Sequence, residues 1–387
     1  MKFSIFLEHQ LPRPWGPDSE YNLFQESLDQ VELADKLGYD CVWEVEHHFL
    51  EEYSHSAQPE VFLAACSQRT KNIRLGHGII HLTTNHPYRV AEKVASLDLV
   101  SNGRVEFGMG EGSSVTELHP FDRRFRDKRG IFLEAVQAII PGFTQPGVEF
   151  KGEFFDLPKR AIIPKPLQKP HPPLWVACSQ MDTVRDAGRW GFGALVFTFK
   201  NPEYAQAWVH AYYDEFLNNP DPICDYQKNP NVAVVNTFMC AETDEKAQEM
   251  ASGSTFFEFA LNFYNSHGPV EPGSLNLWDE FLEWKKTPRG SRPIKGLVGS
   301  PDTIRKTLQE YREIGIDQMI LLNQAGKNTH EDICASLELF ASEVMPEFHA
   351  AEAEHLEWKQ KILNREIVLE KIDTDQFQQA STQTQVK

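Results

Sequence analysis

The feature that most constrains the fold of this chain is a repeated alternation between short apolar runs and longer runs with helical spacing. Several short runs are rich in Val, Ile and Phe without alternating polar residues, as expected for strands buried on both faces. Strands are predicted at residues 3–8, 41–46, 73–80, 105–109, 174–177, 193–197, 233–240 and 318–322. Helices are predicted after them, with examples at 87–100, 125–140, 243–263, 302–314 and 330–344. Eight strand–helix units predict an α/β protein of the (β/α)₈ TIM-barrel type, and a doubly wound parallel sheet is the second choice.

Two long segments and the C-terminal part fall outside this alternation. Residues 151–173 are rich in Pro and Lys and are predicted to form an extended connector. Residues 265–295 contain Gly, Pro and Trp, and a loop this long in a compact domain is usually a lid or a disordered segment. We therefore predict a barrel over residues 1–347 with an insertion or lid at 265–295. A charged, helical and partly disordered tail is predicted over 348–387.

The composition argues against several classes of function. A formal charge of −18 disfavours binding to nucleic acid or to anionic membranes. The six cysteines are scattered without a C-x-x-C pair, which predicts reduced thiols. No apolar run approaches the roughly twenty residues needed to cross a bilayer, and the N-terminal run is too short for a secretory signal. We therefore expect a cytoplasmic enzyme.

Glycines and polar side chains follow the predicted strands. The carboxyl ends of parallel strands usually house the chemistry of α/β proteins, so these residues define one candidate rim. Its members are Glu8, His47, Gly78, Ile79, Gly110, Glu111, Ser179 and Phe197. The rim lacks a second carboxylate placed for glycoside hydrolysis, and the chain has no G-x-S-x-G nucleophile elbow. On the local sequence alone, an equal alternative is that His47 and His48 have no chemical role and are loop histidines whose hydrogen bonds are satisfied by neighbouring residues.

The glycines after the fourth predicted strand permit two interpretations. Gly108-Met109-Gly110-Glu111-Gly112 looks like a dinucleotide fingerprint, but no helix opens on it in the required register. Such glycines let the backbone approach a flat ring or a phosphate closely, and a plain turn is an equal alternative.

Two further groups of residues suggest ligands. His77, His81 and His86, together with His47 and His48, could indicate a metal cluster. The chain has no recognisable zinc spacing and no metal-binding helix motif, so we favour structural histidines and predict no metal site. Ser179 or a near neighbour is predicted to cap the helix after the fifth strand, where free N–H groups can hold a phosphate; a plain helix cap is the alternative.

Taken together, these motifs resemble the bacterial luciferase-like monooxygenases, a flavin-dependent family with a TIM-barrel fold. The likeness runs from residue 1 to about 347, and the set of motifs is more specific than any single one. It is carried by Trp43 with Glu46-His47-His48-Phe49, by His86-Pro87-Tyr88-Arg89-Val90, by Ser101-Asn102-Gly103-Arg104 and by Val344-Met345-Pro346.

The resemblance implies a two-component FMN-dependent monooxygenase. Reduced FMN would come from a separate NAD(P)H-dependent flavin reductase, and O₂ would form a C4a-peroxyflavin. That species would transfer one oxygen atom to an apolar aldehyde, ketone or terpene-like molecule. The resemblance also implies a homo-oligomer. An F420-dependent oxidoreductase and a non-catalytic flavin-binding barrel are the alternatives.

The resemblance also assigns roles to residues. His47 matches the catalytic histidine of the family, Gly78-Ile79 matches a non-proline cis peptide beside the flavin, and Ser179 matches a phosphate-binding residue. The predicted cofactor-binding residues are Gly78, Ile79, Gly110, Glu111, Ala177 and Ser179. Glu8, Phe197 and Phe199 would line the substrate pocket.

Gly110 and Glu111 depart from the pattern, since luciferase itself has a reactive cysteine and a phosphate-binding arginine there. A carboxylate cannot pair with phosphate, so Arg185 or Lys200 would have to replace the arginine, or backbone N–H groups would bind the flavin. Light emission is therefore not implied.

Overall fold

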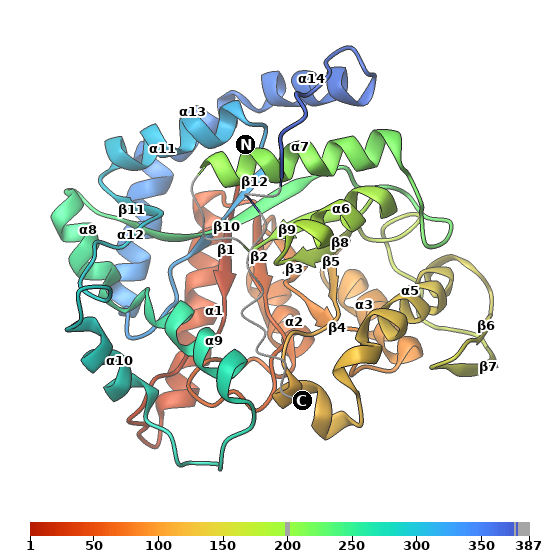
Figure 1. Cartoon of the computed structure of the whole chain (residues 1–387), viewed down its shortest axis with the longest axis horizontal. Helices are drawn as coiled ribbons and strands as arrows, with labels where there is room; N and C mark the ends of the chain where they lie inside the picture. Colours follow the sequence, from red (N-terminus) through yellow and green to blue (C-terminus); the bar gives the residue numbers. More distant parts are fainter. Residues whose placement is uncertain (198–201, 375–376, 378–387) are drawn as a thin grey trace.

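A computed structural model describes residues 1–197, 202–374 and 377. Eight parallel strand positions close into a barrel surrounded by helices (Figure 1). β12 pairs with both β1 and β10, and β10 also pairs with β9 at the other end of the strand order, so the sheet closes on itself. The TIM-barrel prediction is confirmed, and the doubly wound alternative is wrong. The barrel strands are β1 (Lys2–Leu7), β2 (Cys41–Glu44), β3 (Arg74–His77) with β4 (Ile80–His81), β5 (Val105–Gly110), β8 (Leu174–Cys178), β9 (Gly193–Val196), β10 (Val232–Cys240) and β12 (Gln318–Leu322).

The helices begin and end where the sequence supplies capping residues. Ser300 caps α11 with Pro301 at its first position, and Gly38 ends α1 in the left-handed conformation. The helices around the barrel are α1 (Ser19–Leu37), α2 (Pro59–Arg69), α3 (Pro87–Val100), α5 (Lys128–Thr144), α6 (Met181–Trp190), α7 (Pro202–Asn218), α8 (Asp244–Met250), α11 (Pro301–Glu313) and α12 (His330–Glu343).

The buried apolar residues form two clusters. The larger lies between the strands and the surrounding helices. The smaller fills the barrel interior with Phe6, Trp43 and Trp175, and it continues into the α9 (Phe256–His267) and α10 (Leu277–Lys285) segments. The indole of Trp43 lies so close to Gly76 that a Cβ there would meet it at 2.3 Å. The interior is therefore a packed core, and chemistry has to be housed at its carboxyl end.

Two predicted elements are wrong in detail. The connector predicted at 151–173 contains β7 (Asp156–Arg160), which pairs antiparallel with β6 (Val148–Lys151) in a separate hairpin. The helix predicted at 243–263 is interrupted by a short 3₁₀ turn, Ala251–Gly253, between α8 and α9. A Cβ on Gly253 would lie 2.7 Å from the Lys327 backbone nitrogen, so the close approach of another loop accounts for the break.

Short elements complete the carboxyl side of the barrel. They are α4 (Val115–Leu118), two 3₁₀ turns at His119–Phe121 and Phe125–Asp127, and β11 (Leu297–Gly299), which pairs with β10 beyond the barrel.

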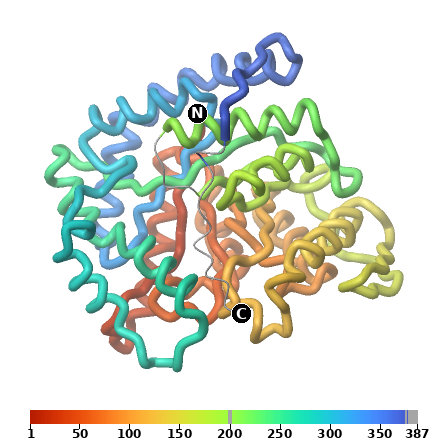
Figure 2. Tube along the Cα trace, in the orientation of Figure 1, coloured from red at the N-terminus to blue at the C-terminus, as the bar shows by residue number. Residues whose placement is uncertain are grey.

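The C-terminal segment returns to the amino end of the strands. α12 ends at Glu343, and α13 (Met345–Ala350) begins at once with Pro346 in its first turn. α13 and α14 (Glu352–Leu363) lie on the side of the molecule where the N-terminus is found, whereas α9 and α10 lie on the opposite side (Figure 2). The end of the predicted tail, residues 378–387, lies outside the described residues. No helix in the described part of the chain is long and apolar enough to cross a membrane.

Candidate functional site

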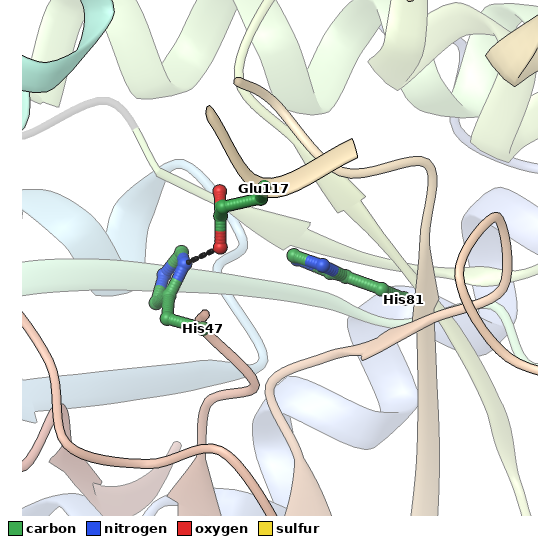
Figure 3. Close-up of side chains that lie close together, drawn as sticks. All are labelled: His47, His81 and Glu117. Carbon is green, nitrogen blue, oxygen red and sulfur yellow. Dashed lines mark hydrogen bonds and ion pairs between the residues drawn. The ribbon is translucent and has the colours of Figure 1, made fainter. Parts of the chain in front are cut away.

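Four ionisable side chains converge at the carboxyl end of the barrel. Glu8 follows β1, His47 follows β2, His81 ends β4, and Glu117 lies in α4 after β5. Figure 3 shows the rings of His47 and His81 on either side of the Glu117 carboxylate. The ring centroids of the two histidines are 5.8 Å apart. Residues separated by more than a hundred positions in the sequence thus meet because each strand ends at the same rim.

His47 lies between two carboxyl groups. Its Nδ1 is 2.8 Å from Oε1 of Glu117, in a hydrogen bond, and its Nε2 is 3.4 Å from Oε1 of Glu8. Glu117 also accepts hydrogen bonds from the His48 backbone N–H (3.1 Å) and from the Ser114 hydroxyl (3.0 Å). No hydrogen bond to Nε2 of His47 is found within the described residues, so this nitrogen is available to a reacting molecule.

The surroundings shift the pKa of all three groups. Burial lowers the pKa of His47, but Glu117 and Glu8 outweigh burial and raise this pKa to about 9. Burial raises the pKa of Glu117, but the His47 charge and hydrogen bond outweigh it and lower this pKa to about 2. Burial alone dominates for Glu8 and raises its pKa to about 8. At neutral pH, His47 is therefore protonated, Glu117 ionised and Glu8 neutral.

His48 has a different environment from its neighbour. Its Nε2 lies 3.0 Å from Oε1 of Glu46, which also accepts a hydrogen bond from Nδ2 of Asn85 (2.8 Å). The backbone N–H of His81 donates to the other oxygen of Glu46 at 3.1 Å. The alternative of a satisfied loop histidine therefore fits His48, whereas Nε2 of His47 makes no hydrogen bond in the part of the chain that the structure describes.

The glycines of the rim are explained by close approach within the protein. The Gly78–Ile79 peptide bond is cis, as the resemblance implies. A Cβ on Gly110 would lie 2.4 Å from Cδ1 of Ile79, and one on Gly108 would lie 1.9 Å from the carbonyl oxygen of His77. Side chains at these two positions would displace Ile79 or the β3 backbone. The cofactor-binding role assigned to Gly78, Ile79 and Gly110 stays a prediction.

The Glu111 carboxylate faces two cations, Lys128 and Arg129. Nε of Arg129 is 2.6 Å from Oε1 of Glu111, and Nζ of Lys128 is 3.6 Å from Oε2. Arg129 also bonds Asp186 of α6 at 2.6 Å. The cations beside Glu111 thus come from the start of α5, where a positive charge balances the carboxylate.

The predicted phosphate-binding residues lie next to this cluster. Met109 of β5 pairs with Val176 of β8, so Gly110 and Ala177 follow side by side at the rim. Ser179 is exposed, and the residue that caps α6 is its neighbour Gln180.

Two further predicted groups are the cations that could replace the arginine of luciferase and the aromatic residues of the substrate pocket. Arg185 is held by Oγ1 of Thr374 at 2.5 Å. The Phe197 ring lies 5.7 Å from the Phe6 ring, over the barrel interior. Phe199 and Lys200 lie outside the described residues.

Two residues of the site were missed from the sequence. Ser114-Val115-Thr116-Glu117 is an S-x-x-E capping pattern, and Ser114 does cap α4 by accepting from the Glu117 backbone N–H. The pattern would have placed Glu117 in a first helical turn, but not its side chain, which accepts from the Ser114 hydroxyl with one oxygen and bonds His47 with the other. Tyr53, whose ring lies 5.3 Å from that of His47, carries no such local signal.

A metal ion is the other ligand that this arrangement could hold. The donor atoms of His47, His81 and Glu117 lie within 4.8 Å of one another. Nδ1 of His81 is buried and has no hydrogen-bond partner among residues 1–197, 202–374 and 377. The absence of a metal site stays a prediction.

The insertion predicted at 265–295, together with α9, covers one side of the rim. The Phe257 ring of α9 lies 5.3 Å from the ring of Tyr53. The buried carboxylate of Glu52 accepts hydrogen bonds from the backbone N–H groups of Leu277 (2.6 Å) and Trp278 (3.2 Å) at the start of α10. The loop that carries His47 thus also holds the insertion.

Known proteins match the barrel over most of its length. A family model described as luciferase-like monooxygenase matches residues 1–318. The chain is 25% identical over 356 residues to the oxygenase component of the flavin-dependent trigonelline monooxygenase of Acinetobacter baylyi, covering 90% of this chain and 96% of that protein.

Solved structures share the barrel fold of this chain. The monooxygenase RslO1 of Streptomyces bottropensis has a TM-score of 0.73 and 26% identity, covering 90% of this chain and all of that one (100%). An F420-dependent secondary alcohol dehydrogenase shares the fold with a TM-score of 0.68 at 18% identity, covering 89% of this chain and 98% of that one.

Proposed function

This chain belongs to the luciferase-like monooxygenases, and we propose that it is the oxygenase component of a two-component FMN-dependent enzyme. The proposed reaction places one oxygen atom from O₂ into an apolar small molecule such as an aldehyde, a ketone or a terpene. Reduced FMN would be supplied by a separate NAD(P)H-dependent reductase. The observation that carries the proposal is the position of His47 at the rim, where its Nε2 accepts or donates no hydrogen bond within the described residues and lies 3.4 Å from Oε1 of Glu8.

The rim fits a flavin ring. Ile79, Ala177 and Phe197 offer apolar surface around the cis peptide. Nδ1 of His81 and Oε1 of Glu8, which make no hydrogen bond within the described residues, offer polar partners at the same rim. A ligand site that is mostly apolar with a few convergent polar groups is the usual arrangement for a cofactor.

The phosphate end of FMN would face the start of α6. Helix N-termini favour anions because their first N–H groups are free and the helix dipole is positive there. Lys128 and Arg129 supply positive charge close by, although Glu111 partly neutralises them. We infer that these two cations, rather than Arg185, stand in for the arginine of luciferase, since Arg185 is engaged with Thr374.

When bound, reduced FMN supplies the electrons that activate O₂, and the protein supplies position and protons. His47 offers a proton at Nε2 to the reacting oxygen, because its raised pKa keeps it charged near neutral pH. Tyr53 lies beside His47 and Phe257 lies beside Tyr53, and with Phe197 over the barrel interior these rings would restrict the access of water.

The proposal is tested by anaerobic titration followed by exposure to oxygen. The protein is titrated with reduced FMN and, separately, with reduced F420, and binding is followed by absorbance. We expect saturable binding of reduced FMN and, after oxygen is admitted, products one oxygen atom heavier from a panel of aldehydes, ketones and terpenes. Binding of F420 alone, with hydride transfer that needs no oxygen, would instead support the alternative suggested by the F420-dependent neighbour.

A further inference from the structure

The two carboxyl groups beside His47 have opposite environments. The Glu117 carboxylate accepts hydrogen bonds from His47, from the His48 backbone and from the Ser114 hydroxyl. Glu8 is 1% exposed, and no described residue forms a hydrogen bond with its Oε1. A carboxylate that accepts several hydrogen bonds stays ionised, whereas a buried carboxyl without them favours its neutral form. One histidine is therefore paired with one ionised and one neutral acid.

We propose that Glu8, His47 and Glu117 form a proton relay in which Glu117 fixes the proton on Nδ1, Nε2 donates to the reacting oxygen, and neutral Glu8 replaces that proton. This inference rests on the proposed monooxygenase function. Each transfer moves one proton and no electrons. The Nε2–H bond breaks as an O–H bond forms on the acceptor, and the Oε1–H bond of Glu8 then breaks as Nε2–H forms again. Glu8 is left as a carboxylate, and it regains a proton from solvent when the product leaves.

Glu117 acts as the positioning residue of this relay. A carboxylate bonded to one ring nitrogen fixes the tautomer of an imidazole and stabilises its charged form, which leaves the opposite nitrogen for proton transfer. The 2.8 Å bond to Nδ1 provides that restraint here. The ring is further enclosed by Tyr53 and His81, whose centroids lie 5.3 Å and 5.8 Å away.

The groups that face Glu8 keep it neutral. Glu44 of β2 and Glu117 of α4 are carboxyl groups whose negative charge would oppose ionisation of Glu8. Burial is the largest influence on its pKa, and His47 is the charged group that acts in the other direction. Two carboxyl groups that share a site take different protonation states, and such a division marks the acid and the base of a reaction.

The groups that face His47 balance its charge. Glu46 is the further carboxylate that raises the pKa of His47, while burial keeps the pKa of His81 low. The relay therefore contains one imidazolium, one carboxylate and one neutral acid, with no net charge. A buried group of this composition avoids the large cost of an unpaired charge.

The first test needs neither flavin nor substrate. Infrared difference spectra between the wild type and Glu8→Gln at neutral pH should contain the carbonyl band of a neutral carboxylic acid. In the wild type, this band should disappear as the pH rises through about 8. The control Glu60→Gln removes a carboxylate that Lys93 holds at 3.1 Å and should leave the band unchanged. A wild-type spectrum without the band at neutral pH would overturn the relay.

The second test follows the imidazole directly. Protein labelled with ¹⁵N in its histidine rings is titrated by NMR without flavin, and His47→Asn identifies the signal. Glu117→Gln should lower the His47 midpoint by at least about one pH unit, because a charge-assisted hydrogen bond is lost. Glu117→Asp, which retains the charge, should recover part of this shift. An unchanged midpoint in Glu117→Gln contradicts the assigned role.

The third test separates the relay from the proposed function. With reduced FMN, O₂ and a substrate, Glu8→Gln should lower kcat by about tenfold or more and leave KM unchanged, with a loss of the limb of the pH profile near 8. A wild type that turns over no substrate refutes the monooxygenase proposal, while the infrared and NMR results still decide the protonation of the three residues. An unchanged profile in an active Glu8→Gln enzyme refutes the relay alone.

Discussion

Two groups of histidine and carboxylate lie at opposite ends of the barrel. At the amino end, Asp317 accepts hydrogen bonds from Nε2 of His355 (2.7 Å), Nζ of Lys359 (2.9 Å) and the backbone N–H of Val232 (2.7 Å). At the carboxyl end, His47 lies between Glu117 and Glu8, and Oε1 of Glu8 accepts no hydrogen bond from the described residues. The residue types are nearly the same, but the balance of donors and acceptors is reversed.

This difference separates a structural network from a chemical one. One carboxylate satisfies several donors at the amino end, and the bonds tie α14 to the starts of β10 and β12. At the carboxyl end two carboxyl groups share one imidazole, so a proton has more than one position to occupy. Buried networks that are fully satisfied add rigidity, whereas an unpaired buried polar group in a native structure calls for an explanation such as a role in binding or catalysis.

The largest expected effect is on activity, from removal of the rim histidine. His47→Ala should lower turnover with reduced FMN by about a hundred- to ten-thousand-fold, because the proton donor at the reacting oxygen is lost. Stopped-flow mixing with oxygen and product analysis provide the measurement. His355→Ala is the matched control at the amino end and should retain turnover per folded molecule. Equal activity in the wild type and His47→Ala would show that the histidine at the carboxyl end has no more catalytic importance than the one at the amino end.

The next effect is on stability, from the carboxylate at the amino end. Asp317→Asn should lower the free energy of unfolding by about 3–5 kcal/mol, because the buried Lys359 loses its carboxylate partner and keeps only neutral acceptors such as Oδ1 of Asn231. Urea unfolding followed by circular dichroism measures this change. Glu357→Gln is a control on the same helix and should have little effect, because its ion pair with Lys361 is exposed. A near-neutral Asp317→Asn would show that this network does not stabilise the fold.

The contributions of Asp317 at the amino end and Glu8 at the carboxyl end to the free energy of unfolding should change in opposite directions with pH. Burial raises the pKa of Asp317, but Lys359 and His355 outweigh it, so the pKa lies below its ordinary value of 3.8. The stabilisation by Asp317 is therefore present above that value and is lost as the pH falls further. Glu8 has a raised pKa, so its stabilisation is present below 4.5 and is lost as the pH rises toward about 8.

Thermal unfolding across pH checks this contrast with two variants. The difference between the wild type and Asp317→Asn should shrink in acid. Glu8→Gln does not titrate at this position, so it should gain stability relative to the wild type between pH 4.5 and about 8. Parallel curves for the wild type and Glu8→Gln would contradict a neutral buried acid.

The smallest expected effect concerns the insertion over the rim. Glu52→Gln weakens the charge-assisted bonds to the first N–H groups of α10, a change of about 1 kcal/mol. Amide hydrogen exchange in α10 should rise by about fivefold, with little change at α14. Glu283→Gln, in an exposed pair with Lys286 on α10, is the control and should leave exchange unchanged. Unaltered exchange in Glu52→Gln would show that other contacts hold the insertion.

Much of the fold could be predicted because its signals are local. β12 and α3 have the predicted bounds of 318–322 and 87–100, since apolar spacing and capping residues act over a few positions. The break between α8 and α9 could not be predicted, because it depends on a loop some seventy residues away that approaches Gly253. The β6–β7 hairpin was missed because its strands are short and largely exposed, so they lack an apolar pattern.

The candidate site was predictable only in part. His47 was found because it directly follows a buried strand, and the cis bond at Gly78–Ile79 came from the family resemblance. Glu117 gave only a capping pattern, which predicts where a helix starts but not where the side chain turns. Lys128 and Arg129 begin an ordinary helix, and nothing local links them to Glu111.

The sequence by itself determined the order of strands and helices and which residues follow each strand, because hydrophobic spacing and capping depend on near neighbours. Only the tertiary structure decided that Glu8 and Glu117, which lie 39 and 70 positions from His47, meet at one imidazole. Their protonation states follow from that meeting, since a pKa depends on burial and on charges a few ångströms away. The closed sheet brings these groups together. Burial then keeps Glu8 a neutral acid, whereas the charge and hydrogen bond of His47 outweigh burial and keep Glu117 ionised.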